Sequence, residues 1–156
     1  MQTCQIKTPL GIAKISGNQN GISEILVLDE GEISEQIPVI LKICVNQLNE
    51  YFFGNRTQFS FKIHQSGTDF QQKVWQELTN IPFGKTISYM DLSKKLGDPK
   101  VIRAAASANG KNKLWIVVPC HRVIGTDGSL TGYAGGLWRK KWLLEHENPS
   151  NQQSLF

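Results

Sequence analysis

The run Pro119-Cys120-His121-Arg122 places a thiol, an imidazole and a guanidinium at consecutive positions. A cysteine attacks as its thiolate, and a free thiol with a pKa of about 8.5 is mostly protonated at neutral pH, so a nucleophilic cysteine needs a base or a positive charge nearby. The imidazole of His121 would be that base, with Glu145 or Glu147 as the carboxylate on its second nitrogen. If this segment is extended, the Cys120 and His121 side chains point to opposite faces, and a bridging water or a tight turn must connect them. A buried cysteine beside an ordinary histidine is the alternative at this point.

The two other cysteines, Cys4 and Cys44, form no CxxC pair with each other or with Cys120. An odd number of cysteines without such a pair argues against a disulfide framework. Cys44 falls on an apolar helical stripe, so we interpret it as a buried hydrophobe. With His64 these residues give fewer than the four ligands of a closed structural zinc site, and we predict no metal.

Composition and charge limit the classes of protein that remain. The 156 residues are 40% hydrophobic and 19% charged, an ordinary globular balance for one domain or two small ones. Dividing the formal charge of +4 after Gln65 leaves −1 before that residue and +5 after it. Six basic residues, opposed between positions 94 and 113 only by Asp98, concentrate the excess: Lys94, Lys95, Lys100, Arg103, Lys111 and Lys113. Such a cluster suits a polyanion, and a solvated protein face is the alternative.

The first 65 residues have the pattern of a small α/β unit. Short strands are expected at Gln2–Thr8, Lys14–Ile15 and Ile22–Leu28, where apolar runs lie between glycine and proline residues. Apolar residues at steps of three and four predict a helix from about Pro38 to Phe53. Alternation of aromatic and polar residues predicts a last strand at residues 59–63.

After a linker at residues 64–67, the pattern becomes mainly helical. Thr68 can cap a helix ending near Ile81, Ser88 begins a second helix through Leu96, and Pro99 begins a third that closes at Asn109-Gly110. The second and third form a helix-turn-helix pattern across Gly97, which by itself is more typical of two helices that only pack together. A buried strand is then expected at residues 114–118, and a last helix begins near residue 137.

Three motifs carry a resemblance to a known family: residues 119–125 (PCHRVIG), Tyr133-Ala134-Gly135-Gly136 and residues 81–89 (IPFGKTISY). They resemble the O6-alkylguanine-DNA alkyltransferases, particularly the single-module bacterial members, and the match runs from Gly67 to Glu147. The resemblance implies an α+β protein, with a small ribonuclease-H-like α/β N-terminal domain (residues 1–65). A mainly helical, winged-helix-like alkyltransferase domain with a helix-turn-helix (66–148) and a frayed tail (149–156) would follow.

The resemblance also implies the reaction. An alkyl group would pass directly and irreversibly from O6-alkylguanine, and from O4-alkylthymine, in DNA to Cys120 after base flipping. Each molecule would act once, without a cofactor. His121 would activate the thiol through water, Glu147 would orient the imidazole, Tyr89 would donate a proton to the leaving base, and Asn112 would brace the loop around the cysteine.

By the same resemblance, Arg103 would enter the base stack and replace the flipped nucleotide. DNA contacts are expected in the minor groove, from Lys100, Ala104, Lys111 and Lys113 beside Arg103. The wall of the base pocket is expected from Val123, Tyr133, Ala134, Gly135 and Gly136, where glycine lets the backbone approach the base.

The expected partner is double-stranded DNA carrying alkylated bases, bound by a monomer without a membrane partner. The N-terminus lacks the continuous apolar region of a secretory signal, so we expect a cytoplasmic protein. Two other classes stay open. A lesion reader would keep the Arg103 helix and would not need the thiol, whereas a cysteine hydrolase would turn over and would usually take its histidine from a distant segment.

Overall fold

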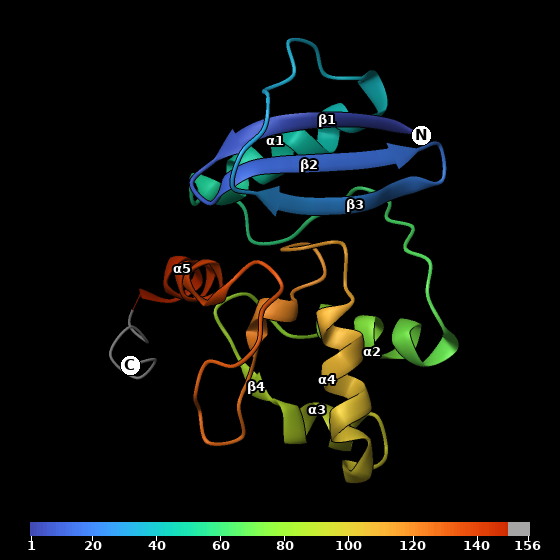
Figure 1. The fold of residues 1–156 in the computed structure, drawn as a ribbon, viewed down its shortest axis with the longest axis vertical. Helices are drawn as coiled ribbons and strands as arrows, with labels where there is room; N and C mark the ends of the chain where they lie inside the picture. Colours follow the sequence, from blue (N-terminus) through green and yellow to red (C-terminus); the bar gives the residue numbers. More distant parts are fainter. Residues whose placement is uncertain (150–156) are drawn as a thin grey trace. The chain divides into compact units, whose positions relative to one another are not determined.

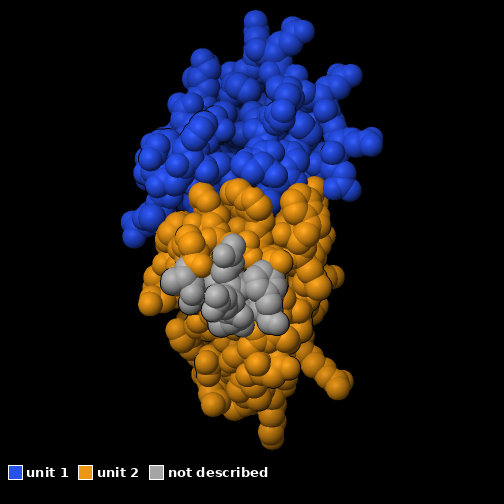
Figure 2. All heavy atoms as spheres, turned by 90° about the vertical axis from the view of Figure 1, so that its left-hand side faces the viewer, with its two compact units in different colours: residues 1–66, 113–117 blue, residues 67–112, 118–156 orange. Residues whose placement is uncertain are grey.

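The computed structural model describes residues 1–149, which fold into two compact units (Figure 2). The first unit comprises residues 1–66 together with 113–117, and the second comprises residues 67–112 and the chain from residue 118 onward. Most of the predicted tail, from residue 150, lies outside the described residues.

An antiparallel sheet of β1 (Gln2–Thr8), β2 (Gly11–Asn18) and β3 (Gly21–Leu28) forms the first unit together with α1 (Lys42–Phe52) (Figure 1). Strand β2 is longer than the two residues predicted for it. The sheet residues that alternate onto one face are buried, and α1, which follows a short 3-10 turn, η1 (Val39–Leu41), buries its apolar stripe. This core consists of Cys4, Ile6, Ala13, Ile15, Ile25 and Val27 from the sheet, and Leu41, Cys44, Leu48 and Tyr51 from η1 and α1.

The strand predicted at residues 59–63 is wrong. Of these residues only Ile63 forms a bridge, which pairs it with Ile22. In this bridge Ile22 N–H donates to Lys62 O, and His64 N–H donates to Ile22 O. Ser60 instead pairs with the Gln47 side chain, donating its N–H to Oε1 (3.0 Å) and accepting Nε2–H at its hydroxyl (2.7 Å). Because the Gln47 side chain binds the backbone N–H and the hydroxyl of Ser60, this N–H is not available to a partner strand, and no strand ladder extends through this segment.

Three helices build the first half of the second unit: α2 (Asp69–Thr79), α3 (Tyr89–Lys95) and α4 (Ile102–Gly110) (Figure 1). Thr68 caps α2 in a complete capping box with Gln71, and the Ser88 hydroxyl accepts Asp91 N–H at the start of α3. Helix α3 is followed by Gly97 at φ 100°, a conformation that favours glycine, and by the 3-10 turn η2 (Pro99–Val101). Helices α3 and α4 therefore form a helix pair with a short turn between them.

The second half of this unit carries the PCHR segment. The 3-10 turn η3 (Cys120–Arg122) is followed by β5 (Val123–Ile124), which pairs in parallel with β4 (Ile87–Ser88). The last helix, α5 (Leu137–Glu147), begins after Gly136 at φ 93°. The sequence analysis found α5 and missed the β4–β5 pair, because two-residue strands are too short to show alternation.

The strand predicted at residues 114–118 is also wrong, although Leu114 and its neighbours are buried as expected. A single bridge joins Leu114 to Ile25, after which Ile116 has φ 75° and Val117 N–H bonds Trp115 O. A left-handed β-branched residue turns the chain at once, so an extended run cannot continue there.

None of the helices within residues 1–149 is long and apolar enough to cross a membrane.

Candidate active site

Cys120 lies on a tight turn inside the second unit. Residues 120–122 form a 3-10 turn instead of an extended segment, and Cys120 N–H bonds Val118 O at 2.8 Å. Because the backbone turns here, the alternation of side chains expected for an extended chain does not apply. The Cys120 residue is only 4% exposed, so the thiol is enclosed by protein.

The two residues after the cysteine bind one carboxylate. His121 Nε2 lies 2.7 Å from Glu147 Oε2, while Arg122 donates to both oxygens of Glu147, from Nε (2.8 Å) and Nη2 (3.0 Å). Arg122 Nη1 also donates to Ile81 O at 2.7 Å, and all three side chains are buried. Helix α5 thus presents Glu147, and not Glu145, to the turn that carries the cysteine.

The electrostatics of this network determine which groups are charged. Burial acts to raise the pKa of Glu147, but His121 and Arg122 beside it hold that pKa well below its usual range. Burial lowers the pKa of His121, although Glu147 opposes this shift. Glu147 is therefore an anion paired with the Arg122 cation, and His121 is neutral at pH 7.

A neutral His121 whose Nε2–H donates to Glu147 has an unprotonated Nδ1. This nitrogen is buried and has no hydrogen-bond partner among residues 1–149. Burial raises the pKa of the neighbouring Cys120 thiol, while the Asn112 side chain and the Lys140 cation act to lower it. The site consequently holds a protonated thiol and a free imidazole lone pair on adjacent residues.

Asn112, two residues after the end of α4, and Tyr89, at the start of α3, approach the same turn. Asn112 is buried and donates from Nδ2 to Val118 O at 2.8 Å. Tyr89, the first residue of α3, accepts at its hydroxyl from Asn109 Nδ2 at 3.3 Å.

Lys140 binds the backbone of Val123, one of the residues expected to form the base pocket, and of Thr131. Its ammonium is fully buried and donates to Val123 O at 2.6 Å and to Thr131 O at 2.7 Å. Burial lowers the pKa of Lys140 to about 8, against an opposing effect of Cys120. Gly135 O accepts from Arg139 Nη1 at 3.0 Å, so α5 also binds the segment just before it.

The other expected pocket residues precede α5 directly. Gly136 N–H bonds Tyr133 O at 2.9 Å in a turn, and Ala134 is exposed. Burial raises the pKa of Tyr133 well above its usual value.

The residues expected to bind DNA are not all in one unit. Arg103 and Ala104 are exposed near the start of α4, Lys100 is exposed on η2, and Lys111 is exposed at the end of α4. Lys113 belongs to the first unit, where its N–H donates to Gln65 Oε1 at 2.6 Å.

Sequence reasoning assigned no role to three buried polar residues of this site: Asn109, Arg122 and Lys140. A signal existed for Lys140, because it lies seven residues before Glu147, with Leu143 and Leu144 between them, on one helical stripe. A charged residue on a stripe of apolar residues indicates a buried cation with specific partners.

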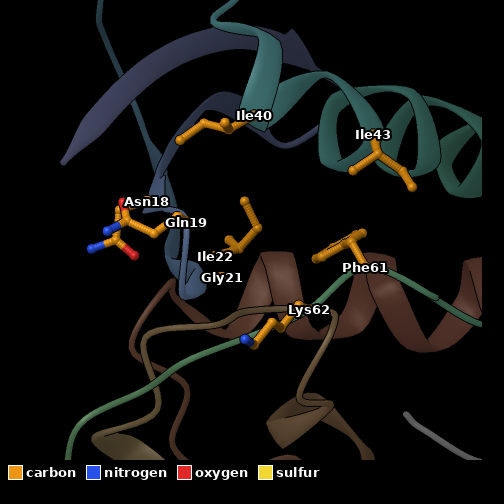
Figure 3. A pocket seen from close by; sticks show the side chains of 8 residues that line it. All are labelled: Asn18, Gln19, Gly21, Ile22, Ile40, Ile43, Phe61 and Lys62. Carbon is orange, nitrogen blue, oxygen red and sulfur yellow. The ribbon is translucent and has the colours of Figure 1, made fainter.

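A hollow in the first unit is not part of this site. It is lined mainly by Ile22, Ile40, Ile43 and Phe61, whose side chains surround it, with Lys62 at its border (Figure 3). None of the described lining residues is a cysteine, histidine or carboxylate. Within residues 1–149, no group of three or more His, Cys, Asp or Glu side chains could hold a metal ion.

The chain is similar in sequence and in structure to methyltransferases that act on methylated DNA. Residues 69–149 match the family model described as 6-O-methylguanine DNA methyltransferase, DNA binding domain. The chain is 41% identical over 147 residues to the methylated-DNA–protein-cysteine methyltransferase of Mycobacterium tuberculosis strain H37Rv, covering 91% of this chain and 89% of that relative. It is 40% identical over 158 residues to the constitutive methylated-DNA–protein-cysteine methyltransferase of Bacillus subtilis strain 168, covering 94% and 95%.

A crystal structure of Mycobacterium tuberculosis OGT in complex with DNA is similar with a TM-score of 0.84 at 39% identity, covering 97% of this chain and 92% of that one. The α+β fold is therefore that of the methyltransferase structures. The chain belongs to the methylated-DNA–protein-cysteine methyltransferase family.

Proposed function

We propose that this protein repairs DNA by transferring methyl and larger alkyl groups from guanine O6, and from thymine O4, to Cys120, irreversibly and once per molecule. The observation that carries this proposal is the buried His121–Glu147–Arg122 network next to a buried thiol, in a chain of this family. A structural cysteine would not need a neighbouring imidazole whose second nitrogen is free.

The roles of the side chains follow from their chemistry. The thiol proton of Cys120 passes through a water molecule to His121 Nδ1, and Glu147 holds the ring and stabilises the imidazolium that forms. The thiolate then attacks the alkyl carbon. An S–C bond forms, the C–O6 bond breaks, and its electron pair stays on the base. Tyr89 donates a proton to the purine ring, and its phenolate regains a proton from the imidazolium of His121 through solvent. The net transfer of one proton is therefore from sulfur to guanine.

The remaining residues of the second unit bind the DNA and the base. A base inside a duplex cannot place its alkyl carbon in line with a sulfur atom, so it must be flipped out. Arg103 fills the space it leaves, while Ala104 lets α4 approach the minor groove and Lys100, Lys111 and Lys113 contact phosphates. The crystal structure of the related OGT with DNA supports this partner.

Val123, Tyr133, Ala134, Gly135 and Gly136 form the wall of the base pocket, and Asn112 braces the loop before Cys120 through Val118 O. No cofactor takes part, because the thiol itself accepts the group.

The proposal extends to the domains and the location. The first 65 residues form a ribonuclease-H-like domain, supported by the antiparallel sheet with α1. Residues 66–148 form a winged-helix-like domain, supported by the α3–α4 pair. The protein acts as a monomer in the cytoplasm.

The deciding experiment is intact-protein mass spectrometry after mixing the protein with excess duplex that carries one O6-methylguanine. We expect a gain of one methyl group, mapped to Cys120 and saturating at one per molecule. Cys120→Ser should gain nothing, and Cys4→Ser, which alters a buried cysteine of the first unit, should gain one methyl group. Binding without a change in mass would favour the lesion reader, and repeated turnover would favour a hydrolase.

A further inference from the structure

Asn109 connects the side chain of Tyr89 to the backbone of Cys120. It lies in the last turn of α4 and is 4% exposed. Its Nδ2 is 3.3 Å from Tyr89 Oη and 3.4 Å from Cys120 O. Three elements, α3, α4 and η3, therefore meet at one amide group.

The carbonyl of Cys120 determines how this amide is oriented. A carbonyl oxygen only accepts hydrogen bonds, so Asn109 must direct Nδ2, its donor, toward it. Exchanging the nitrogen and oxygen of the amide would place Oδ1 against another acceptor. Oδ1 itself is buried and has no partner within the described chain, so no other contact competes for the orientation.

The second hydrogen on Nδ2 then points at Tyr89 Oη, which acts as the acceptor. The hydroxyl proton of Tyr89 is consequently not used in this bond. The Thr131 side chain also hydrogen-bonds this hydroxyl, and when the Thr131 hydroxyl donates, as Asn109 does, the Tyr89 proton can be directed toward another acceptor. A hydrogen bond given to a phenol oxygen also stabilises the phenolate. Burial raises the pKa of Tyr89, the Asn109 bond acts to lower it, and nearby Cys120 and Thr131 act to raise and to lower it respectively.

Resting on the function proposed above, we infer that Asn109 is a positioning residue for alkyl transfer. It holds Tyr89 as a hydrogen-bond acceptor, so that the hydroxyl proton faces the base whose alkyl group moves to Cys120. The same amide fixes Tyr89 relative to the backbone of the acceptor cysteine. The proton donor and the sulfur acceptor are thus placed by one side chain of α4, the helix that carries Arg103.

The test is a double-mutant cycle measured by single-turnover transfer from an O6-methylguanine duplex. Asn109→Leu, which keeps the size and removes both donors, should slow transfer about tenfold, equivalent to one lost hydrogen bond. In a Tyr89→Phe background, the same substitution should slow transfer less than twofold, because the hydroxyl it positions is gone. Asn109→Ala should behave in the same way if Asn109→Leu does not fold. Ser107→Ala, an exposed change on the same helix, is the matched control and should leave the rate unchanged.

A second readout does not depend on activity. The ionisation of Tyr89 is followed by tyrosinate absorbance, after subtracting the signal of the Tyr89→Phe variant. Asn109→Leu should move this titration to higher pH, because the phenolate loses a donor. Affinity for the duplex, measured in a Cys120→Ser background, should stay the same.

The two proposals fail in different ways. If wild-type protein transfers no methyl group, the proposed function fails. If wild-type protein transfers the group but Asn109→Leu slows the reaction equally with and without the Tyr89 hydroxyl, Asn109 is only structural and the inference is overturned. An unchanged Tyr89 titration overturns it as well.

Discussion

Glu147 is the residue on which the proposed chemistry of this site depends. Its carboxylate binds a planar guanidinium through two hydrogen bonds and an imidazole through a third. The fork of Arg122 fixes the plane of the carboxylate, and that plane in turn fixes the ring of His121. Arg122 also neutralises the anion, which leaves the imidazole uncharged and able to accept a proton.

Replacing Glu147 tests this dependence at the residue scale. Glu147→Gln leaves the Arg122 cation buried without its anion, so we expect the free energy of unfolding to fall by about 3–5 kcal/mol. Transfer should also slow, because an amide stabilises an imidazolium poorly. Urea denaturation and single-turnover kinetics measure the two effects. Glu145→Gln is the matched control two residues away, and similar losses there would contradict the assignment of Glu147.

The acid sensitivity of the protein follows from the same residues. The pKa of His121 is lowered in the folded state from an unfolded value of about 6.5, so its contribution to stability is complete above pH 6.5 and is lost as pH falls toward the folded pKa. Glu147, whose pKa is also lowered, adds its own loss below its unfolded value of about 4.3. Stability should fall by up to about 1.4 kcal/mol per pH unit below 6.5, and more steeply below 4.3.

Urea denaturation between pH 4 and 8 measures this slope. His121→Gln should remove the part between pH 6.5 and 4.3, whereas His146→Gln should retain it. A flat profile from pH 7 to 5 would show that His121 is not buried in its neutral form.

At the scale of elements, the site is assembled by contacts between helices that are distant in sequence. Trp75 of α2 donates its indole N–H to Ala108 O of α4 at 2.9 Å, and this bond is buried. Lys140 of α5 binds the backbone on two sides of the loop that follows β5. Helix α2 thus fixes the helix proposed to meet DNA, and α5 fixes the proposed pocket wall.

Trp75→Phe keeps most of the apolar ring and removes the donor to Ala108 O. We expect a loss of about 0.5–1.5 kcal/mol in the free energy of unfolding, because one buried hydrogen bond is lost while Ala108 O still accepts from Lys111 N–H at 3.2 Å. Thermal and urea denaturation measure it. The control is Trp138→Phe on α5, where the ring is 54% exposed, and it should change stability by less than about 0.5 kcal/mol.

Lys140→Met removes the cation from the pocket loop but keeps a long side chain. The buried carbonyl Val123 O and the carbonyl of exposed Thr131 lose their donor, so we expect stability to fall by about 1–3 kcal/mol, mainly through Val123. The pKa of Cys120 should rise, since the Lys140 cation acts to lower it. Thiol titration with an alkylating reagent measures that shift. Lys94→Met, which changes an exposed lysine of α3, should alter neither quantity. An unchanged thiol pKa in Lys140→Met would show that the Lys140 cation does not act on Cys120.

At the scale of the whole molecule, the net charge of +4 is distributed unevenly along the chain. Exposed lysines and Arg103 lie on α3, η2 and α4 of the second unit. A surface that neutralises phosphates releases counterions, so its affinity for DNA should fall as the salt concentration rises.

We expect the double variant Lys100→Glu/Lys111→Glu to bind duplex DNA more weakly and to reduce the slope of log affinity against log salt by about 2. Lys42→Glu, an exposed change on α1 of the first unit, is the control. It changes the charge by as much as either Lys100→Glu or Lys111→Glu alone, and it should leave the slope unchanged. Fluorescence anisotropy in a Cys120→Ser background measures binding without transfer. If Lys42→Glu reduced the salt slope as much per substitution as Lys100→Glu/Lys111→Glu does, DNA affinity would depend only on the net charge of the protein.

The sequence predicted the helices well because each carries its own signals. Thr68 and Ser88 cap the helices that follow them, and the stripe from Leu41 to Tyr51 is buried in η1 and α1. Strands were predicted less well. Residues 59–63 alternate between aromatic or apolar and polar side chains, yet Ser60 N–H donates to the Gln47 side chain of α1 instead of to a strand. Residues 114–118 are apolar, yet the chain turns at Ile116. A strand forms only where a partner strand is available for hydrogen bonding, and the periodicity of a segment does not show whether such a partner lies beside it.

The sequence by itself determined which groups are present for chemistry: a cysteine followed by histidine and arginine, two carboxylates near the end of the chain, and motifs that resemble one family. These are properties of residue type and short spacing. The residues alone left Glu145 and Glu147 open as the partner of the imidazole, and the resemblance indicated Glu147. Only the tertiary structure decided that Arg122 neutralises this carboxylate and that Asn109 lies between Tyr89 and Cys120. The physical reason is that these contacts join residues 11 to 26 positions apart. Their geometry depends on how helices pack, and local sequence does not encode it.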